Sequence, residues 1–336
     1  MVQLLGLVLI SFFTTSFLLI PFIDYLFILK NKQLKGSVRE SVSADTPIHN
    51  LLLSGKDIAV PVGGGILLIG IITVLSTLAA FLLNLIKTEL FILLFTLLSF
   101  GAIGFIDDVK KIFLNFSGKY KGLRSRYIFL YQIIFALISS LLLYFLLGFD
   151  NIFIPIFGNI ILGWWYIPLA VFAIVSFSNA YNISDGLDGL SSGLLMICLF
   201  AFLVLAHSVF DVTLGIFVGI WIGALIAYLY FNVFPARIYL GDAGAYGFGA
   251  ALAMVGLLTG KIIGLAVIGG VYVVIVVSSL LQIFFKRVVK KKLIPVAPIH
   301  MYFKYVGWEE PKIVTRFWLA GIIFAILGLW LAFMSH

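Results

Sequence analysis

Two adjacent carboxylates and a lysine form the first group of residues whose types and spacing suit chemistry. The segment Gly104-Phe105-Ile106-Asp107-Asp108-Val109-Lys110-Lys111 ends a long apolar run. Neighbouring carboxylates stay ionised together only when a cation compensates them, so Asp107 and Asp108 indicate a magnesium ion or a perturbed pKa. Lys111 returns to the side of a helical turn that Asp108 occupies and can reach a phosphate. Taken alone, the pattern also fits a charged helix end that marks a membrane boundary.

A second polar group contains no basic residue. It reads Asn179-Ala180-Tyr181-Asn182-Ile183-Ser184-Asp185-Gly186-Leu187-Asp188-Gly189-Leu190, and its polar residues recur at a spacing of three that stacks them on one helix face. Oxygen ligands without neighbouring protein cations suit a hard metal ion, or the donors of a uridine and a sugar. A turn with Asx caps would explain the Asp-Gly pairs. It does not explain four polar residues in this register, so we favour a functional interpretation.

Two further groups complete the set. Asn232 precedes Pro235-Ala236-Arg237 and Gly241-Asp242-Ala243-Gly244, where glycines let the backbone approach an ion or a phosphate closely. The last group contains His300 in Ala297-Pro298-Ile299-His300, followed by Gly307-Trp308-Glu309-Glu310-Pro311-Lys312. Alone, a Gly-Asp turn or a single histidine is weak support for a site. The presence of the other polar groups strengthens the case for Asp242 and for His300.

Composition shows what kind of protein must position these groups. Of the 336 residues, 63% are hydrophobic and only 11% are charged, against about 25% charged in an average soluble domain. The mean hydropathy is +1.20. A soluble globule of this composition would expose apolar patches everywhere, and disorder, a nucleic-acid module or a disulfide framework are excluded as well. Cys198 is the only cysteine. The chain is therefore a polytopic membrane protein.

Apolar runs long enough to cross a bilayer predict an all-α fold with about ten transmembrane helices in a single domain over residues 1–336. The segment 149–162 alternates too irregularly for a span and predicts a short hairpin on the outer surface. The predicted spans are 3–29, 63–86, 89–106, 127–148, 163–180, 189–207, 212–231, 245–259, 261–285 and 317–334.

Charge predicts the orientation of these spans. Of the 22 basic residues, all except Lys87 and Lys261 fall on one side of the membrane. The positive-inside rule makes that side cytoplasmic and places both termini outside. Carboxylates gather at cytoplasmic helix ends, whereas transporters and pumps usually place ionisable groups near the midplane. Asp24, in the first predicted span, is the only serious candidate for the ionisable residue within a span that a transporter would need. The pattern favours an enzyme with its site on the cytoplasmic loops, where a water-soluble substrate meets a lipid.

With the four groups in this order, the chain resembles the polyprenyl-phosphate N-acetylhexosamine-1-phosphate transferases over about residues 38–318. The matching motifs are GFIDD with Lys111, NAYNISDGLDGL, and Asn232 with GDAG. The API-His300 stretch with GWEEPKIVTRFW is similar to the branch that transfers a muramoyl-pentapeptide. Two departures stand out. Met301 and Tyr302 replace further histidines, and VPVGGG at 60–65 replaces a loop that usually reads like GTPTMGG.

The resemblance implies a family fold of ten helices with external termini, and a reaction in peptidoglycan synthesis. That reaction is the magnesium-dependent transfer of phospho-N-acetylmuramoyl-pentapeptide from a UDP-activated donor to undecaprenyl phosphate, which releases UMP and gives lipid I. The implied partners are the UDP-sugar, undecaprenyl phosphate and membrane lipids, and no nucleic acid is expected. A homodimer is compatible with the resemblance. The implied location is the bacterial cytoplasmic membrane. Direct attack by the lipid phosphate and an aspartyl-phosphate intermediate both stay open. The nearer alternative is the same chemistry with UDP-N-acetylglucosamine, and the more remote one is a transporter.

The resemblance also implies roles for single residues. Asp242 would be a magnesium ligand, and Asp107 would be the catalytic base or nucleophile near the lipid phosphate. The catalytic set is then Asp107, Asp108, Asp242 and His300, the metal ligands come from Asp107, Asp108 and Asp242, and the substrate-binding residues are Lys56, Lys111, Asn182, Asp185, Asp188 and Asn232.

Overall fold

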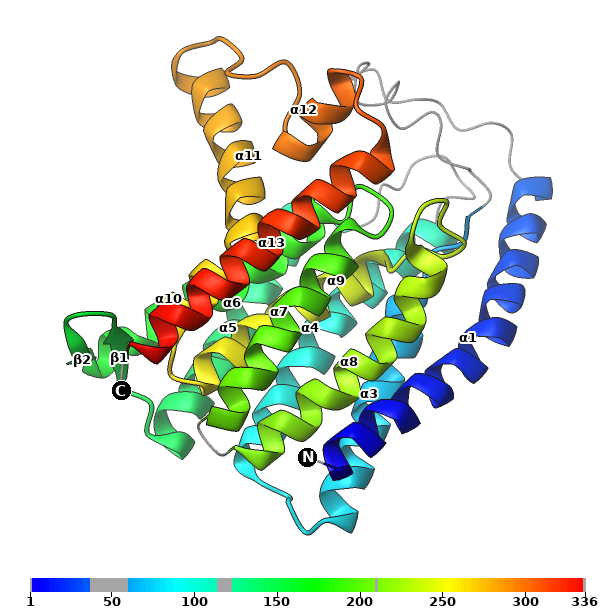
Figure 1. The fold of residues 1–336 in the computed structure, drawn as a ribbon. Coiled ribbons are helices and arrows are strands. Elements are labelled where there is room, and N and C mark those ends of the chain that lie inside the picture. Colours follow the sequence, from blue (N-terminus) through cyan, green and yellow to red (C-terminus); the bar gives the residue numbers. More distant parts are fainter. Residues whose placement is uncertain (1, 37–59, 114–122, 209–210, 335–336) are drawn as a thin grey trace.

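The chain folds into a bundle of long helices with one small hairpin at its edge (Figure 1). This computed structural model describes residues 2–36, 60–113, 123–208 and 211–334. The first half contains α1 (Val2–Gly36), α3 (Gly64–Leu82), α4 (Thr88–Phe113), α5 (Ser125–Leu147), β1 (Asn151–Ile154), β2 (Gly158–Ile161), the short helix η2 (Gly163–Trp165) and α6 (Tyr166–Ser184). The second half contains α7 (Leu190–Ser208), α8 (Val212–Asn232), α9 (Gly241–Leu258), α10 (Ile262–Ile268), α11 (Gly270–Val288), α12 (Ile299–Tyr305) and α13 (Glu310–Phe333).

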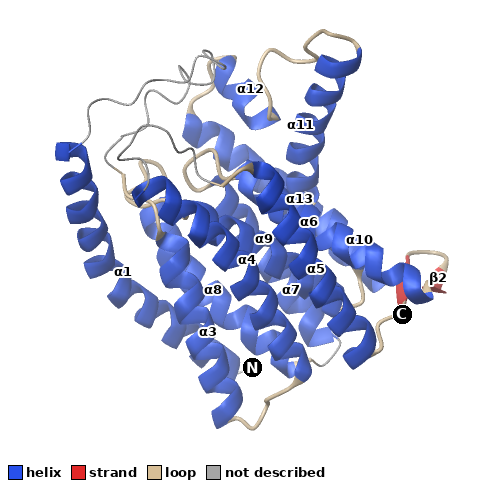
Figure 2. Cartoon of the chain, turned by 180° about the vertical axis from the view of Figure 1, so that it is seen from behind, coloured by secondary structure: helices blue, strands red, loops and turns tan. Residues whose placement is uncertain are grey.

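The all-α prediction and the number of spans are confirmed. Within the described residues, ten helices are long and apolar enough to cross a membrane. The predicted hairpin is also present, because β1 and β2 pair antiparallel with Asn151 opposite Ile161. Both termini lie at the end of the bundle opposite α12 and the loops around it (Figures 1 and 2). Which end faces the cytoplasm stays a prediction.

Helix α9 forms the centre of the bundle, in contact with α3, α4 and α6. Its sequence is rich in glycine and alanine, which lets neighbouring backbones approach closely. A Cβ atom added at Gly104 in α4 would lie 2.1 Å from the Asp242 carbonyl oxygen, and one added at Gly65 in α3 would lie 2.4 Å from the Gly244 Cα. Glycines from two helices therefore fix where α9 begins, and with it the position of Asp242.

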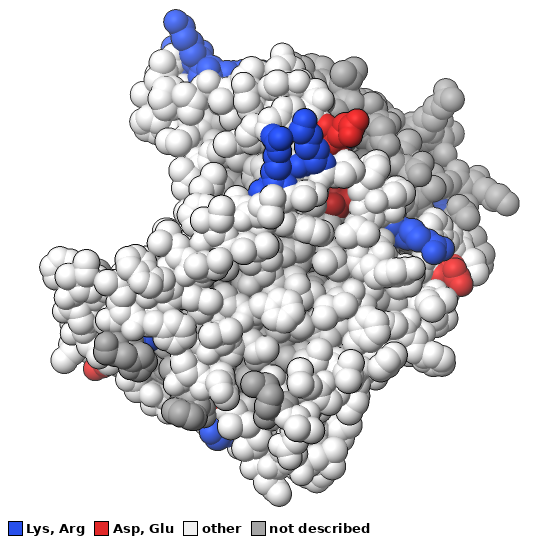
Figure 3. All heavy atoms as spheres, in the orientation of Figure 1, with Lys and Arg blue, Asp and Glu red and all other residues white. Residues whose placement is uncertain are grey.

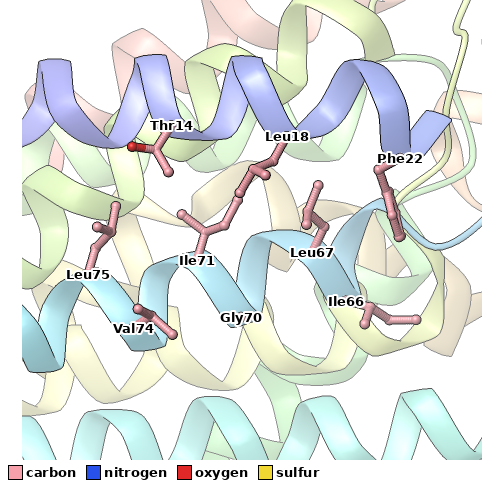
Figure 4. Close-up of a pocket in the computed structure, with 9 residues that line it drawn as sticks. All are labelled: Thr14, Leu18, Phe22, Ile66, Leu67, Gly70, Ile71, Val74 and Leu75. Carbon is pink, nitrogen blue, oxygen red and sulfur yellow. The ribbon is translucent and has the colours of Figure 1, made fainter. Parts of the chain in front are cut away.

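The outer helices expose apolar side chains, as lipid-facing helices do. Figure 3 shows a broad band of one face with almost no charged side chains. Helices α1 and α3 diverge enough to leave an apolar groove of about 360 Å³ between them (Figure 4). Its lining residues are Thr14, Leu18, Phe22, Ile66, Leu67, Gly70, Ile71, Val74 and Leu75. A groove of this kind suits a lipid hydrocarbon chain rather than a polar solute.

Several predicted spans differ from the observed helices; α1 continues past 29 to Gly36 and α9 begins at Gly241 rather than 245. The run 261–285 is broken at Gly269 into α10 and α11, and α11 leans away from the bundle (Figures 1 and 2). A Cβ at Gly269 would lie 2.4 Å from a ring atom of Phe177, so α6 packs directly against the break. Helix α4 continues past 106 to Phe113, which puts Asp107, Asp108 and Lys111 on the helix itself. Helix α13 begins at Glu310 rather than near 317, because the span prediction counted only apolar residues.

Candidate active site

Lys111 joins two carboxylates that lie far apart in the sequence. Its ammonium nitrogen is 2.7 Å from Asp107 Oδ2, one helical turn earlier in α4, and it also forms an ion pair with Asp242 Oδ2 at the start of α9. The Asp107 side chain is almost fully buried, whereas that of Asp242 is 20% exposed and that of Lys111 is 49% exposed. Asp107 Oδ1 accepts a hydrogen bond from the Leu123 backbone N–H. The predicted first and third groups thus meet around one ammonium group, which opens to solvent.

Asp108 faces the first turn of α9. Its Oδ1 accepts a hydrogen bond from the Asp242 N–H at 3.2 Å, and its Oδ2 accepts one from the Ala243 N–H at 3.1 Å. These N–H groups at a helix start have no partner within the helix, so a carboxylate there is favourable. Gly241 has a φ of +83°, and a Cβ at this position would lie 2.8 Å from Asp108 Oδ2. Asp108 therefore orients Asp242 through the backbone.

The segment at 60–65 supports the same turn from the other side. Gly63 N–H and Gly64 N–H both donate to the Tyr239 carbonyl oxygen, at 3.1 and 3.0 Å, and Gly65 N–H donates to the Leu240 carbonyl oxygen at 2.8 Å. The loop that replaces the usual family sequence therefore holds the residues just before Asp242. In this structure its contacts run through glycine backbone and need no threonine.

Asn182 brings the second group to the carboxylates. Located near the end of α6, it donates from Nδ2 to Asp242 Oδ1 at 3.0 Å. We call Asp107, Asp108, Lys111, Asn182 and Asp242 the carboxylate cluster. It contains three acidic side chains and one basic one, so with all of them ionised its formal charge is negative and it attracts cations.

The donor set of the carboxylate cluster fits a magnesium ion. Among the described residues, no three Asp, Glu, His or Cys side chains lie close enough together to hold a metal ion. Magnesium, however, commonly binds through one or two carboxylates and completes its shell with waters and substrate phosphates. One oxygen each from Asp107 and Asp242 already faces a single cation, the Lys111 ammonium. Two carboxylates that converge on one positive charge provide the hard oxygen ligands that such an ion needs.

A second set of contacts holds the turn between α6 and α7. The Asp188 N–H donates to Glu310 Oε1 at 2.7 Å, and Asp188 Oδ2 accepts from the Ala236 N–H at 3.0 Å. Glu310 Oε2 in turn pairs with Lys304 Nζ at 2.7 Å. His300 is buried in α12, and a Cβ at Gly186 would lie 3.0 Å from its Nε2. The fourth predicted group therefore lies directly against the second.

Other predicted residues are placed differently. The Asp185 carboxylate accepts a hydrogen bond from the Ser191 hydroxyl at the start of α7. Asn232 donates from Nδ2 to the Ile238 carbonyl oxygen of its own loop at 3.0 Å, while its buried Oδ1 has no hydrogen-bond partner. Lys56 lies outside the described residues.

Glu310 lies in the fourth predicted group but is assigned no role there, and Lys304 is a residue that the site prediction missed. Their signal was present in the sequence, because Glu310 directly precedes Pro311, and proline is favoured in the first turn of a helix. An acidic residue in the first turn of a helix that starts at the membrane surface lies close to the neighbouring loops, where the other polar groups gather. The apolar-run criterion started the helix later and so hid this position.

Comparisons with known proteins show the family of this chain. The family model "Glycosyl transferase family 4" matches residues 90–260, which include the whole carboxylate cluster. A phospho-N-acetylmuramoyl-pentapeptide-transferase of Bacillus pumilus is 35% identical over 333 residues, covering 98% of both chains. Relatives with the same name from Thermodesulfovibrio yellowstonii and Borrelia hermsii are 36% and 34% identical, covering 96% and 98% of this chain and 90% and 98% of their own. The chain belongs to glycosyl transferase family 4 and, within it, to the phospho-N-acetylmuramoyl-pentapeptide transferases.

Proposed function

We propose that this protein transfers phospho-N-acetylmuramoyl-pentapeptide from its UDP-linked donor to undecaprenyl phosphate in the bacterial cytoplasmic membrane. The observation that carries the proposal is the meeting of Asp107, Lys111 and Asp242 at one end of the bundle, in a chain of this family. The reaction joins two polyanions, so its barrier is dominated by charge. A half-open cluster at a helix end, with several carboxylates around the partly exposed ammonium group of Lys111, suits that task.

The bond changes are those of a phosphoryl transfer. An oxygen of the lipid phosphate attacks the phosphorus that carries the sugar, the bond from that phosphorus to the UMP oxygen breaks, and UMP leaves with the electron pair. Asp107 would orient the attacking phosphate and hold any proton it carries. Lys111 would offset charge on the phosphates, and Asn182 keeps the Asp242 carboxylate in place. Direct attack and an aspartyl-phosphate intermediate remain alternatives at Asp107.

Magnesium is part of the proposal. Asp242 and Asp107 would hold the ion, which would neutralise the donor diphosphate and stabilise the charge that develops on the leaving phosphate. Asp108 would act on this place only through its hydrogen bonds to the backbone of α9. We further propose that the end of the bundle with this cluster faces the cytoplasm, because the basic last turns of α4, α11 and α12 lie at the same end.

Glu310→Ala is expected to raise the KM for the UDP-linked donor about tenfold and to change kcat less. The variant removes the acceptor of the Asp188 N–H and the partner of Lys304, and a hydrogen bond to a charged group contributes about 1.5–3 kcal/mol. Steady-state kinetics in both substrates measures the effect. Glu310→Gln keeps one acceptor oxygen and should recover part of the donor affinity, which a general loss of folding would not show. A variant with equal losses in kcat and in both KM values would contradict this role.

A panel of donors tests the proposed function. Purified protein is supplied with undecaprenyl phosphate and either UDP-N-acetylmuramoyl-pentapeptide or UDP-N-acetylglucosamine, each with and without magnesium, and the release of UMP is measured. We expect turnover with the muramoyl donor only, and only with magnesium. Turnover with the acetylglucosamine donor would instead support the alternative, for which the Met301 and Tyr302 substitutions in the family pattern are the sequence argument. No turnover with either donor would refute the proposal.

A further inference from the structure

Two cations on α13 are held against one indole ring. Arg316 Cζ lies 4.3 Å from the centroid of the Trp308 ring, and Lys312 Nζ lies 5.3 Å from it. Lys312 and Arg316 are one helical turn apart and both are exposed. Trp308 is itself fixed, because its ring stacks on Phe303 of α12 with 4.6 Å between centroids. The two charges are therefore oriented by an aromatic support that long side chains on a surface normally lack.

An apolar stripe continues from these cations along the same helix. Leu319, Ile323 and Ile326 follow Arg316 at alternating spacings of three and four residues, which keeps them on one face of α13. They are 57%, 68% and 63% exposed, and Trp330 follows at 60%. In Figure 3, basic side chains stand on the upper part of the face that α13 crosses in Figure 1, above a wide uncharged area. The helix thus presents a charged head region and a long apolar surface below it.

We propose that Lys312, Arg316 and Trp308 form a binding site for the phosphate headgroup of an anionic phospholipid, whose acyl chains lie along Leu319, Ile323 and Ile326. The order of charge and apolar surface along α13 matches the order of headgroup and chains in a phospholipid. Lys312 and Arg316 lie one helical turn apart against the same ring, and guanidinium groups bind phosphate oxygens in pairs. Tryptophan is favoured at the depth of the lipid headgroups, where the phosphate would lie.

The neighbouring charges allow this occupant. Glu310 is buried and paired with Lys304, so it faces away from the lipid. Glu309 is exposed beside Lys312 and lowers the net charge of the site to +1. The basic residues after α11, Lys291 and Lys292, are also exposed, and among the described residues neither lies over an aromatic ring. They serve as a matched comparison for the aromatic support, because they provide the same charge beside exposed apolar residues of α11, such as Phe284 and Val288, but without a ring beneath it.

Lipid titration of the purified full-length protein tests the site. Dioleoyl-phosphatidylglycerol and dioleoyl-phosphatidylcholine are added separately, and bound lipid is counted by native mass spectrometry. Each basic residue near a membrane surface adds about 1 kcal/mol of attraction, so Lys312→Ala with Arg316→Ala should weaken binding of the tightest phosphatidylglycerol about 30-fold. Lys291→Ala with Lys292→Ala should weaken it less than threefold. Lys312→Arg should bind like the unchanged protein, and Glu309→Gln should bind more tightly.

Three results would overturn the proposal. The first is equal weakening by the two double variants, since any surface charge would then suffice. The second is equal affinity of the unchanged protein for the two lipids. The third is displacement of the bound lipid by inorganic phosphate but not by chloride at the same ionic strength, which would assign the pair to a free phosphate. If the alanine variants are not monodisperse, Lys312→Gln with Arg316→Gln gives the same comparison with less loss of side-chain volume.

Discussion

Asp242→Asn is expected to lower kcat for UMP release about a thousandfold or more. The Asp242 carboxylate is the only one in the carboxylate cluster that contacts both Lys111 and Asn182, and it provides one of the two oxygens that converge on the cation position. Asparagine keeps the shape and the oxygen that accepts from Asn182, but it loses the negative charge. Several kcal/mol of charge stabilisation depend on a metal ligand of this kind, and each 1.36 kcal/mol is tenfold in rate.

The measurement is release of radiolabelled UMP from the donor at saturating lipid acceptor, over a range of magnesium concentrations. Asp211→Asn is the matched control. Asp211 caps the start of α8 by accepting from the Leu214 N–H at 2.9 Å, an interaction that asparagine preserves. The control should retain its activity, and both variants should purify as monodisperse protein. If Asp242→Asn turned over at a near-normal rate, Asp242 could not be the ligand we propose.

Asp107→Asn is expected to lower kcat by about a hundredfold to ten-thousandfold, the usual contribution of a general acid or base. Its buried carboxylate forms an ion pair with Lys111 and accepts a hydrogen bond from the Leu123 N–H. These contacts fix its orientation toward the partly exposed Lys111 ammonium group. The amide cannot accept a proton and cannot act as a nucleophile. Asp107 lies at the proposed place of the lipid phosphate and is also a proposed magnesium ligand, so high magnesium should restore donor affinity but not kcat.

Pre-steady-state and steady-state UMP release with each substrate varied in turn separates these effects. The informative comparison is Asp108→Asn, whose carboxylate contacts only backbone N–H groups of α9 in the described contacts. That variant should weaken magnesium binding by displacing Asp242 while keeping measurable turnover at high magnesium. Rescue of kcat in Asp107→Asn by high magnesium would contradict a role at the acceptor, and would instead assign Asp107 to the metal alone.

The sequence alone determined which segments cross the membrane. Residues 189–207 and 212–231 were predicted as spans, and the helices observed are Leu190–Ser208 and Val212–Asn232. The agreement has a local cause, because a segment in hydrocarbon must satisfy its backbone hydrogen bonds internally and an apolar run of sufficient length does so as a helix. The motifs at the helix ends likewise pointed to Asp107, Lys111, Asn182 and Asp242, among the other residues predicted for the site.

The tertiary structure alone decided how that set is arranged. Lys111 meets Asp242 across 131 positions of the chain, and Asp108 accepts hydrogen bonds from the backbone N–H groups of Asp242 and Ala243. Asp185 bonds Ser191 instead of joining the carboxylate cluster. The reason is that the position of one helix end against another depends on which small residues face each other, such as Gly104 against the Asp242 carbonyl. Hydrophobic run length specifies a helix but carries no information about its neighbour, so the contacts between helix ends appear only when the bundle packs.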